Sequence, residues 1–502
     1  MMKRLLTIST MLPTLLLSAA ASALAQEGHV TYTEHVGIMS NWEMASDDSY
    51  TASRAGCYEG LTRVSHELKV EPALATGWSQ VDPTTWEFQI REGVTFQDGA
   101  PLDAAAVANA LTQLLNAPIP ARAFSPTAIA SVEASGPMTV TIKTVEPIVA
   151  MPGRLAAPAA AILSPAAYGG RGINPVGTCT GPFEITEFDA QQSVTLKRFD
   201  GYWGGPAKLA GAEVRFIPDT NTRAAMVRTG EVQIALRVPS TAVPQITASG
   251  RADVLKVNAP RITELLLNNS RPPFNDVNVR QAIKYAIDTA AISAAISEGA
   301  SPPAGDPFRS GEPWDAPDAP AVERDLEKAR KLLETAGVNP ASLDLEILGI
   351  TTRTEQRDIA QIIQAMLSEL GITVSVRIAD YGSIEADLMG GNYDMALMSR
   401  GYLTDVPEPI GFLTADYSCE GTFNISQHCD PGLDARLQAA AAEEDPAARY
   451  QGYAELAQHV YDQAITVFLV NETVFDAASS RLTGYTPHPS NYYVLGVDLD
   501  IQ

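Results

Sequence analysis

Strand and helix patterns alternate between residues 326 and 397, and this alternation limits the folds that the chain can adopt. Two segments with helical spacing of apolar residues each end at a glycine, Gly337 and Gly371. Short apolar runs typical of strands lie beside them. The predicted elements are helices over 326–336 and 355–370, and strands over 345–350, 372–378 and 393–397. This order predicts a βαβ arrangement with a mostly parallel sheet.

The rest of the chain mixes the same two kinds of element. Alternating apolar residues predict strands around Trp86, Phe88 and Ile90 and elsewhere, and Asp103 is placed to cap a helix. The further predicted strands cover 139–145, a hairpin within 181–200, and 214–217; the further predicted helices cover 103–115, 222–230 and, as one long helix, 278–297. A chain of 502 residues is too long for one simple core. We therefore expect an α/β protein of two or three lobes.

The first 25 residues have the features of a secretory signal peptide. Lys3 and Arg4 give a positive start, a short apolar stretch covers 5–17, and residues 23–25 (ALA) form a small-x-small cleavage site. The apolar stretch is shorter than the roughly 20 residues that span a bilayer. We predict export and cleavage before Gln26, with a membrane anchor as the alternative.

The charge balance excludes some classes of partner. The formal net charge is −24, which disfavours binding to nucleic acid or to an anionic membrane. Such a charge suits a soluble protein in an extracytoplasmic compartment, and it does not identify a ligand.

Four cysteines, an even number in a chain predicted to be exported, suggest disulfides. Three pairings are possible. We expect Cys419 to pair with Cys429, because the two close a short loop, and Cys57 to pair with Cys179 as the remaining couple. Free buried thiols are the alternative, and the absence of a C-x-x-C spacing disfavours a metal site.

Catalytic motifs are absent from the sequence. It contains no G-x-S-x-G, no G-x-x-x-x-G-K-[ST] and no H-E-x-x-H. Six scattered histidines show no helical ligand spacing, so we predict no metal site and no cofactor. An exported hydrolase therefore remains only a remote alternative, and the prediction is that the protein is not an enzyme.

Four blocks, in order along the chain, resemble the peptide/nickel (dipeptide and oligopeptide) class of ABC-importer solute-binding proteins, family 5. Residues 86–102 (WEFQIREGVTFQDGAPL) resemble the family block W-x-F-x-L-R-x-G-V-x-F-x-D-G-x-P. The other blocks are GPF at 181–183 with YWGG at 202–205, IPD at 217–219 and TGE at 229–231; PF at 273–274 with VRQA at 279–282 and AID at 286–288; and KARKLL at 328–333 with AG at 336–337. These residues have structural explanations as turns and cores, so they identify the scaffold and not the ligand.

The resemblance implies a two-lobed periplasmic-binding-protein fold, type II-like, with an extra third domain and a ligand cleft between the lobes. It implies lobe I at 26–56, 177–260 and 481–502, the extra domain at 57–176, and lobe II at 261–480. It also implies hinge closure over a short peptide or a peptide-like amino-acid conjugate, in the periplasm, followed by delivery to the permease and ATPase subunits of an importer. We expect a monomer.

An enclosed peptide presents an ammonium and a carboxylate, and each needs an opposite charge. Residues 401–413 (GYLTDVPEPIGFL) resemble the family segment G-W-x-x-D-x-x-x-P-x-x-F-L, whose aspartate pairs with the peptide ammonium. The resemblance therefore implies Asp405 for the ammonium and Tyr402, in the place of the family tryptophan, as an aromatic contact. Arg353 lies where dipeptide-binding relatives place the arginine for the carboxylate, and Arg400 is the second choice, since guanidinium matches carboxylate in two hydrogen bonds.

Two other functions remain open. A nickel or metal-chelate receptor of the same family is the main alternative, and a sensory or chaperone-like binding protein without an importer is another. The sequence gives no side-chain preference, affinity or cognate permease.

Overall fold

The structure is a computed structural model that describes residues 28–169, 172–353, 355–404 and 406–502. The predicted signal peptide and Asp405 lie outside these residues. Within the described chain, no helix has both the length and the apolar character needed to cross a bilayer.

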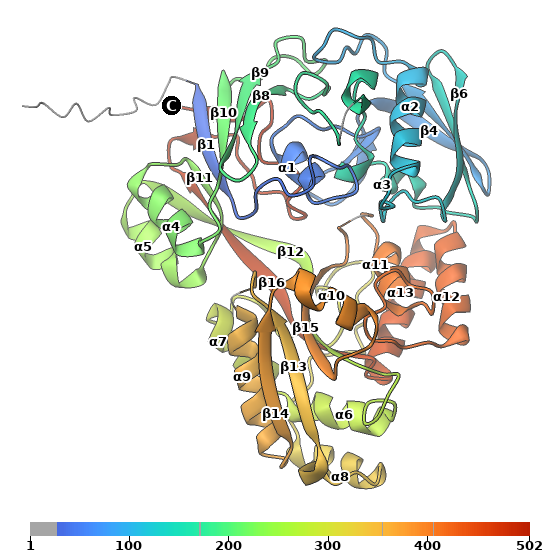
Figure 1. The fold of residues 1–502 in the computed structure, drawn as a ribbon, viewed down its shortest axis with the longest axis vertical. Coiled ribbons are helices and arrows are strands. Elements are labelled where there is room, and N and C mark those ends of the chain that lie inside the picture. The colour runs from blue at the N-terminus through green and yellow to red at the C-terminus, as the bar shows by residue number, and fades with distance from the viewer. Residues whose placement is uncertain (1–27, 170–171, 354, 405) are drawn as a thin grey trace, which may run out of the picture.

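One sheet runs through both lobes. Among the described residues it contains ten strands in the order β14-β13-β15-β12-β16-β11-β1-β10-β9-β8. Their bounds are β1 (His29–Glu34), β8 (Phe183–Asp189), β9 (Ser193–Arg198), β10 (Gly211–Phe216), β11 (Ile234–Val238), β12 (Ala252–Leu267), β13 (Asp344–Ile350), β14 (Thr373–Ala379), β15 (Met395–Gly401) and β16 (Thr466–Ser479). Lobe I is the part around β1 and β8–β11, and lobe II is the part around β13–β15 (Figure 1).

The long strands β12 and β16 connect the two lobes (Figure 1). They pair antiparallel from Ala252–Ser479 in lobe I to Leu266–Thr466 in lobe II, and the register shifts between Asn258 and Ile262. A register shift bends a ladder locally. The chain therefore passes between the lobes at a bend in a hydrogen-bonded ribbon, which is a suitable place for a hinge.

A second sheet packs on lobe I. Its strands are β4 (Ala75–Asp82), β5 (Thr85–Ile90), β7 (Thr139–Thr144) and β6 (Ile129–Gly136), and α2 (Ala104–Leu115) packs against it. Trp86, Phe88 and Ile90 are buried on one face of β5, as the alternation predicts. Phe88 and Tyr32 of β1 belong to one continuous core, so this sheet is part of the body of lobe I. The exact domain boundaries expected from the sequence remain a prediction.

The remaining elements cover the sheets or connect them. The shorter strands are β2 (Thr62–Val64), β3 (Val70–Pro72), β17 (Leu482–Thr483) and β18 (Asp500–Ile501). The helices on lobe I are α1 (Asp48–Arg54), α3 (Met151–Arg154), α4 (Thr220–Thr229) and α5 (Val243–Ala248). Those on lobe II are α6 (Val277–Ala286), α7 (Thr289–Ser297), α8 (Leu326–Thr335), α9 (Glu355–Ser368), α10 (Tyr381–Met389), α11 (Ile410–Tyr417), α12 (Pro431–Ala442) and α13 (Pro446–Asp462).

Two predicted elements were wrong in extent. The single helix over 278–297 is two helices, α6 and α7, because Ile287 is extended and the Asp288 side chain caps α7 by accepting from Ala291 N at 2.9 Å. The strand predicted at 393–397 is instead β15 (Met395–Gly401). It continues to Gly401 because it pairs with β12 as far as Arg261.

Both expected disulfides are present in the described chain, Cys57–Cys179 and Cys419–Cys429. The first pair ties the end of the first lobe I segment to the chain that returns from the four-stranded sheet. The second closes a ten-residue separation at the start of α12.

The Asp288 cap can be tested by substitution. Asp288→Ala is expected to lower the free energy of unfolding by about 1 kcal/mol, since it removes the side-chain acceptor of a helix N-cap. Asp288→Asn keeps an acceptor and should stay close to the parent protein in urea unfolding. Equal losses in the two variants would contradict the cap.

Candidate functional site

The carboxyl ends of strands from both lobes face each other at the hinge. β1 and β11 are parallel and run toward lobe II, whereas β13 and β15 are parallel and run toward lobe I. In α/β sheets, ligands bind outside the carboxyl ends of the strands. The residues at these ends are His35 after β1, Arg237 near the end of β11 and Arg353 after β13. The direction of the strands therefore places the candidate site at the hinge between the lobes.

Glu472 is the central acid of this region. It lies in β16, is buried, and accepts hydrogen bonds from Thr263 Oγ1 at 3.0 Å and from Ser399 Oγ. Its carboxylate lies 3.6 Å from a guanidinium nitrogen of Arg353. Burial raises the pKa of Glu472, but attraction by Arg353 and Arg261 outweighs it, so the pKa lies below the ordinary value. Glu472 is therefore ionised at neutral pH.

Arginines surround this carboxylate. Arg261 of β12 donates to the carbonyl and hydroxyl oxygens of Ser399 at 2.9 and 3.0 Å, and burial together with repulsion by Arg353 lowers its pKa to about 9. Burial and repulsion by Arg353 also lower the pKa of Arg237. These guanidinium groups repel each other, and a bound anion would relieve that repulsion.

Two of these arginines have hydrogen-bonding capacity to spare. Arg353 contacts Glu472 at 3.6 Å and Glu355 at 3.9 Å, both too long for a hydrogen bond. The Arg237 guanidinium donates to no acceptor in the described part of the chain, although its backbone N–H donates to Asp476 Oδ1 at 2.9 Å. Arg237 also has a positive φ of 52°, an uncommon conformation for a residue that is not glycine. Such strained positions occur often at functional sites.

His35 lies in the positive potential of the same arginines. Its side chain is exposed to solvent in the open region between the lobes, and the surrounding protein together with the neighbouring arginines, with Arg237 the strongest, lowers its pKa below the usual range. The imidazole is therefore neutral at pH 7. It can donate or accept one hydrogen bond at this edge of the site without adding charge.

Arg400 and Tyr402, both predicted from the sequence to contact ligand, have partners within lobe II. Arg400 forms two hydrogen bonds to the Asp416 carboxylate, at 2.7 and 2.6 Å, and its guanidinium carbon lies 3.9 Å from the ring centroid of Phe423. Tyr402 is 1% exposed and its hydroxyl donates to the carboxylate of Glu312. Their assignment as ligand contacts stays a prediction.

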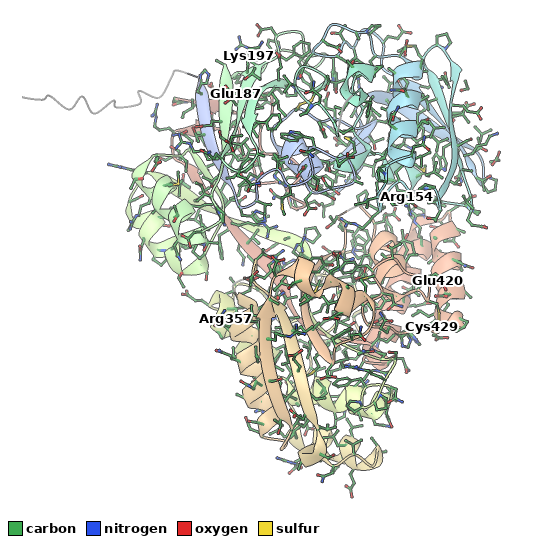
Figure 2. The ribbon with its side chains drawn as sticks, viewed as in Figure 1. Arg154, Glu187, Lys197, Arg357, Glu420 and Cys429 are labelled. Carbon is green, nitrogen blue, oxygen red and sulfur yellow. A yellow bond between two sulfur atoms is a disulfide. The ribbon has the colours of Figure 1, made fainter. Side chains whose placement is uncertain are left out.

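Thr404, the described residue that precedes Asp405, lies where the lobes meet. The hydroxyls of Tyr50 (3.1 Å) and Tyr492, both in lobe I, donate to the carbonyl oxygen of Thr404 in lobe II. Arg154 of α3 lies on the side of lobe I that faces lobe II (Figure 2). Thr404 is therefore held at a contact between the two lobes, close to Arg261 of β12.

A cavity lies elsewhere, away from the hinge. It has a volume of about 330 Å³ and lies within lobe I, beside Glu59, Tyr202, Trp203 and Tyr493. None of the hinge residues lines it. The site at the hinge is consequently assigned from strand topology and charge, and not from cavity size.

Of the residues that the fold brings together at the hinge, only Arg353 was named from the sequence, and its role as a ligand contact stays a prediction; His35, Arg237, Arg261 and Glu472 were not named. A usable signal for two of these, Arg237 and His35, is a charged or titratable residue directly at the end of a strand. β11 itself was not predicted, so that signal was not applied to Arg237. Arg261 and Glu472 lie inside long strands, where the sequence alone gives no indication that the two strands cross between lobes.

Replacing Glu472 tests the buried charge cluster. Glu472→Gln is expected to destabilise the protein by about 3 kcal/mol at pH 7, because it removes a buried carboxylate that offsets the charge of the partly buried Arg353 and Arg261. The folded-state pKa of Glu472 is lowered. Its contribution is therefore present above the ordinary glutamate pKa of about 4.3 and is lost as the pH falls through the folded-state pKa. Thermal unfolding midpoints of parent and variant should converge in acid.

Glu355→Gln is the matched control, since Glu355 contacts the same arginine. Burial raises the pKa of Glu355, so its ionised form is disfavoured in the folded protein. Neutralising it should leave the unfolding midpoint at pH 7 unchanged or higher. An equal fall of the unfolding midpoint in both variants would show that Glu472 contributes no more than Glu355 to stabilising the arginines.

Comparison with known proteins extends these observations. A profile of the family described as bacterial extracellular solute-binding proteins, family 5 Middle, matches residues 69–424. The glutathione-binding protein GsiB of Salmonella paratyphi A is 30% identical over 464 residues, covering 88% of each chain.

Solved structures share the fold. NikA from Staphylococcus aureus, in complex with Ni(L-His)2, superimposes with a TM-score of 0.82 at 22% identity, over 95% of this chain and 100% of that one. DppA from Helicobacter pylori, in complex with the peptide STSA, gives a TM-score of 0.81 at 23% identity, over 95% and 98%.

Proposed function

This chain belongs to family 5 of the bacterial extracellular solute-binding proteins, and from that premise we propose that it captures a short, carboxylate-bearing peptide or peptide-like amino-acid conjugate. The ligand would be enclosed between the lobes by hinge closure, and the protein would then deliver it to an ABC importer. The observation that carries the proposal is the group of arginines around Glu472, in which Arg353 and Arg237 have donors to spare.

A carboxylate is the group that fits these donors best. A guanidinium offers paired N–H groups in one plane, which match the two oxygens of a carboxylate. A hydrogen bond to a charged group contributes about 1.5–3 kcal/mol. The ligand charge would also relieve the repulsion that lowers the pKa values of Arg237 and Arg261. When no ligand is bound, the carboxylate of Glu472 offsets the repulsion between these arginines.

Glutathione is the first ligand to test. It carries two carboxylates and one ammonium, and proteins 30% identical to this chain are named as glutathione-binding. Its two carboxylates suit a site with more than one available arginine. We keep Asp405 as the predicted partner of the ammonium, since its described neighbours lie at the contact between the lobes.

Isothermal titration of ligand-stripped protein with glutathione and with di- and tripeptides tests the proposal. Arg353→Gln is expected to weaken binding by about ten- to a hundredfold, the loss of one charge-assisted contact. Arg228→Gln, an exposed arginine on α4 that contacts Gln245, is the control and should bind as the parent does. Stabilisation by nickel with histidine and by no peptide would contradict the proposal and favour the metal-chelate receptor.

A second test asks which ligand group Arg353 contacts. Amidation of the peptide carboxyl terminus should weaken binding to the parent protein, because it removes the charge that the arginine pairs with. In Arg353→Gln the free acid and the amide should bind with similar affinity. If amidation weakened binding to the variant as much as to the parent protein, the ligand carboxylate would pair with a residue other than Arg353.

A further inference from the structure

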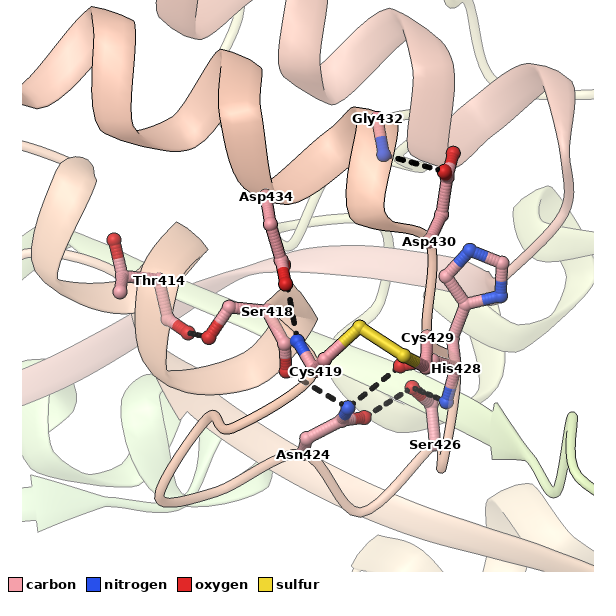
Figure 3. Close-up of a disulfide and its surroundings, with 10 residues drawn as sticks. All are labelled: Thr414, Ser418, Cys419, Asn424, Ser426, His428, Cys429, Asp430, Gly432 and Asp434. Atoms are coloured by element: carbon pink, nitrogen blue, oxygen red, sulfur yellow. Dashed lines mark hydrogen bonds between the residues drawn. A yellow bond between two sulfur atoms is a disulfide. The ribbon is translucent and has the colours of Figure 1, made fainter.

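Two histidines and an aspartate come together in lobe II, on elements that the hinge site does not use. His428 and Asp430 flank Cys429 just before α12, and His459 lies in the last turn of α13. One ligand atom from each of the three residues lies within 4.8 Å of the others. Figure 3 shows the His428 ring beside the Asp430 side chain, and Figure 2 shows Cys429 on the outer side of lobe II, away from β12 and β16.

The local structure holds these groups in place. The Cys419–Cys429 disulfide anchors the loop, and Asn424 Nδ2 donates to the carbonyl oxygens of Ser418 and His428 at 3.0 and 2.7 Å. Asp430 caps α12 by accepting from Gly432 N at 2.8 Å (Figure 3). The helices α12 and α13 pack against each other and carry His459 to the loop. The cluster is therefore preformed.

The histidine nitrogens are unsatisfied. Nε2 of His428 and Nε2 of His459 are buried atoms with no hydrogen-bond partner in the described structure. His459 Nε2 lies 3.7 Å from Asp430 Oδ2, which is too long for a hydrogen bond. Buried polar atoms normally have partners, so two such atoms beside one carboxylate indicate a missing ligand.

Charged groups of both signs surround the cluster. The acidic ones are Asp430 and Asp462, and the basic ones are Arg280 and Arg436. Arg280 is the nearest cation to His428, and its guanidinium donates to the carbonyls of Gln463 and Phe274. Arg436 acts on His459, where Asp430 and Asp462 oppose it.

We propose that His428, Asp430 and His459 bind one divalent transition-metal ion of the Zn²⁺ or Ni²⁺ type, at a site separate from the hinge. Imidazole nitrogen with carboxylate oxygen is a ligand set that such ions take. Three protein ligands leave the remaining coordination positions to water. The ion joins the end of α13 to the disulfide loop and so stabilises lobe II; it is not cargo of the cleft.

Calorimetric titration of tag-free, EDTA-treated protein with ZnCl₂ and NiCl₂, in a buffer without amino acids, tests this proposal. We expect one ion per chain and a raised unfolding midpoint, with no effect of MgCl₂ or CaCl₂. His459→Ala and His428→Ala should each weaken binding at least about tenfold. His66→Ala, at an exposed histidine of lobe I, is the control and should bind as the parent does.

Two further readouts keep the test decisive. Arg353→Gln should retain full zinc affinity, which separates this site from the hinge, and circular dichroism should confirm that the histidine variants fold. Failure of the parent protein to bind zinc or nickel would overturn the proposal. So would unchanged affinity in a folded His428→Ala/His459→Ala double variant, or zinc binding that is lost in Arg353→Gln.

Discussion

The antiparallel pairing of β12 with β16 is the interaction on which the rest of the structure depends. These two strands carry the sheet from lobe I into lobe II, and their hydrogen-bond ladder shifts register between Asn258 and Ile262. The ladder fixes the lobes to each other while the shift gives it a local bend. Because strands of both lobes end beside this ribbon, their terminal side chains converge there. Arg261 and Glu472 belong to the ribbon itself, so the candidate site and the hinge share these residues.

Under the proposed function, this coincidence links closure to the ligand. Several partly buried arginines around one carboxylate are unfavourable on their own, because the guanidinium groups repel each other. The proposed ligand carboxylate would offset that repulsion most when both lobes contribute their arginines, Arg237 from lobe I and Arg353 from lobe II. A ligand can shift a conformational equilibrium only through such a difference in affinity between the states. The proposal therefore predicts that the ligand favours the closed protein.

Local patterns predicted fewer than half of the helices and strands and missed the central strands β12 and β16. The Trp86–Ile90 alternation, the Asp103 cap and the glycines after α8 and α9 act within a few residues, so the sequence shows them directly. The break between α6 and α7 was missed because both helices bury faces in one core, and the apolar spacing continues across Ile287. The length of β15 depends on β12, more than a hundred residues away. The hinge cluster depends on the same kind of distant pairing, which is why only Arg353 of this cluster was named from the sequence, through a resemblance.

The most direct measurement is a crystal structure of the full mature protein grown with glutathione. We expect ligand density between the lobes, with a ligand carboxylate within hydrogen-bonding distance of Arg353 and Arg237. Glu472 should still accept hydrogen bonds from Thr263 and Ser399. Density in the lobe I cavity beside Glu59, or a metal chelate between the lobes with both arginines uninvolved, would contradict this expectation.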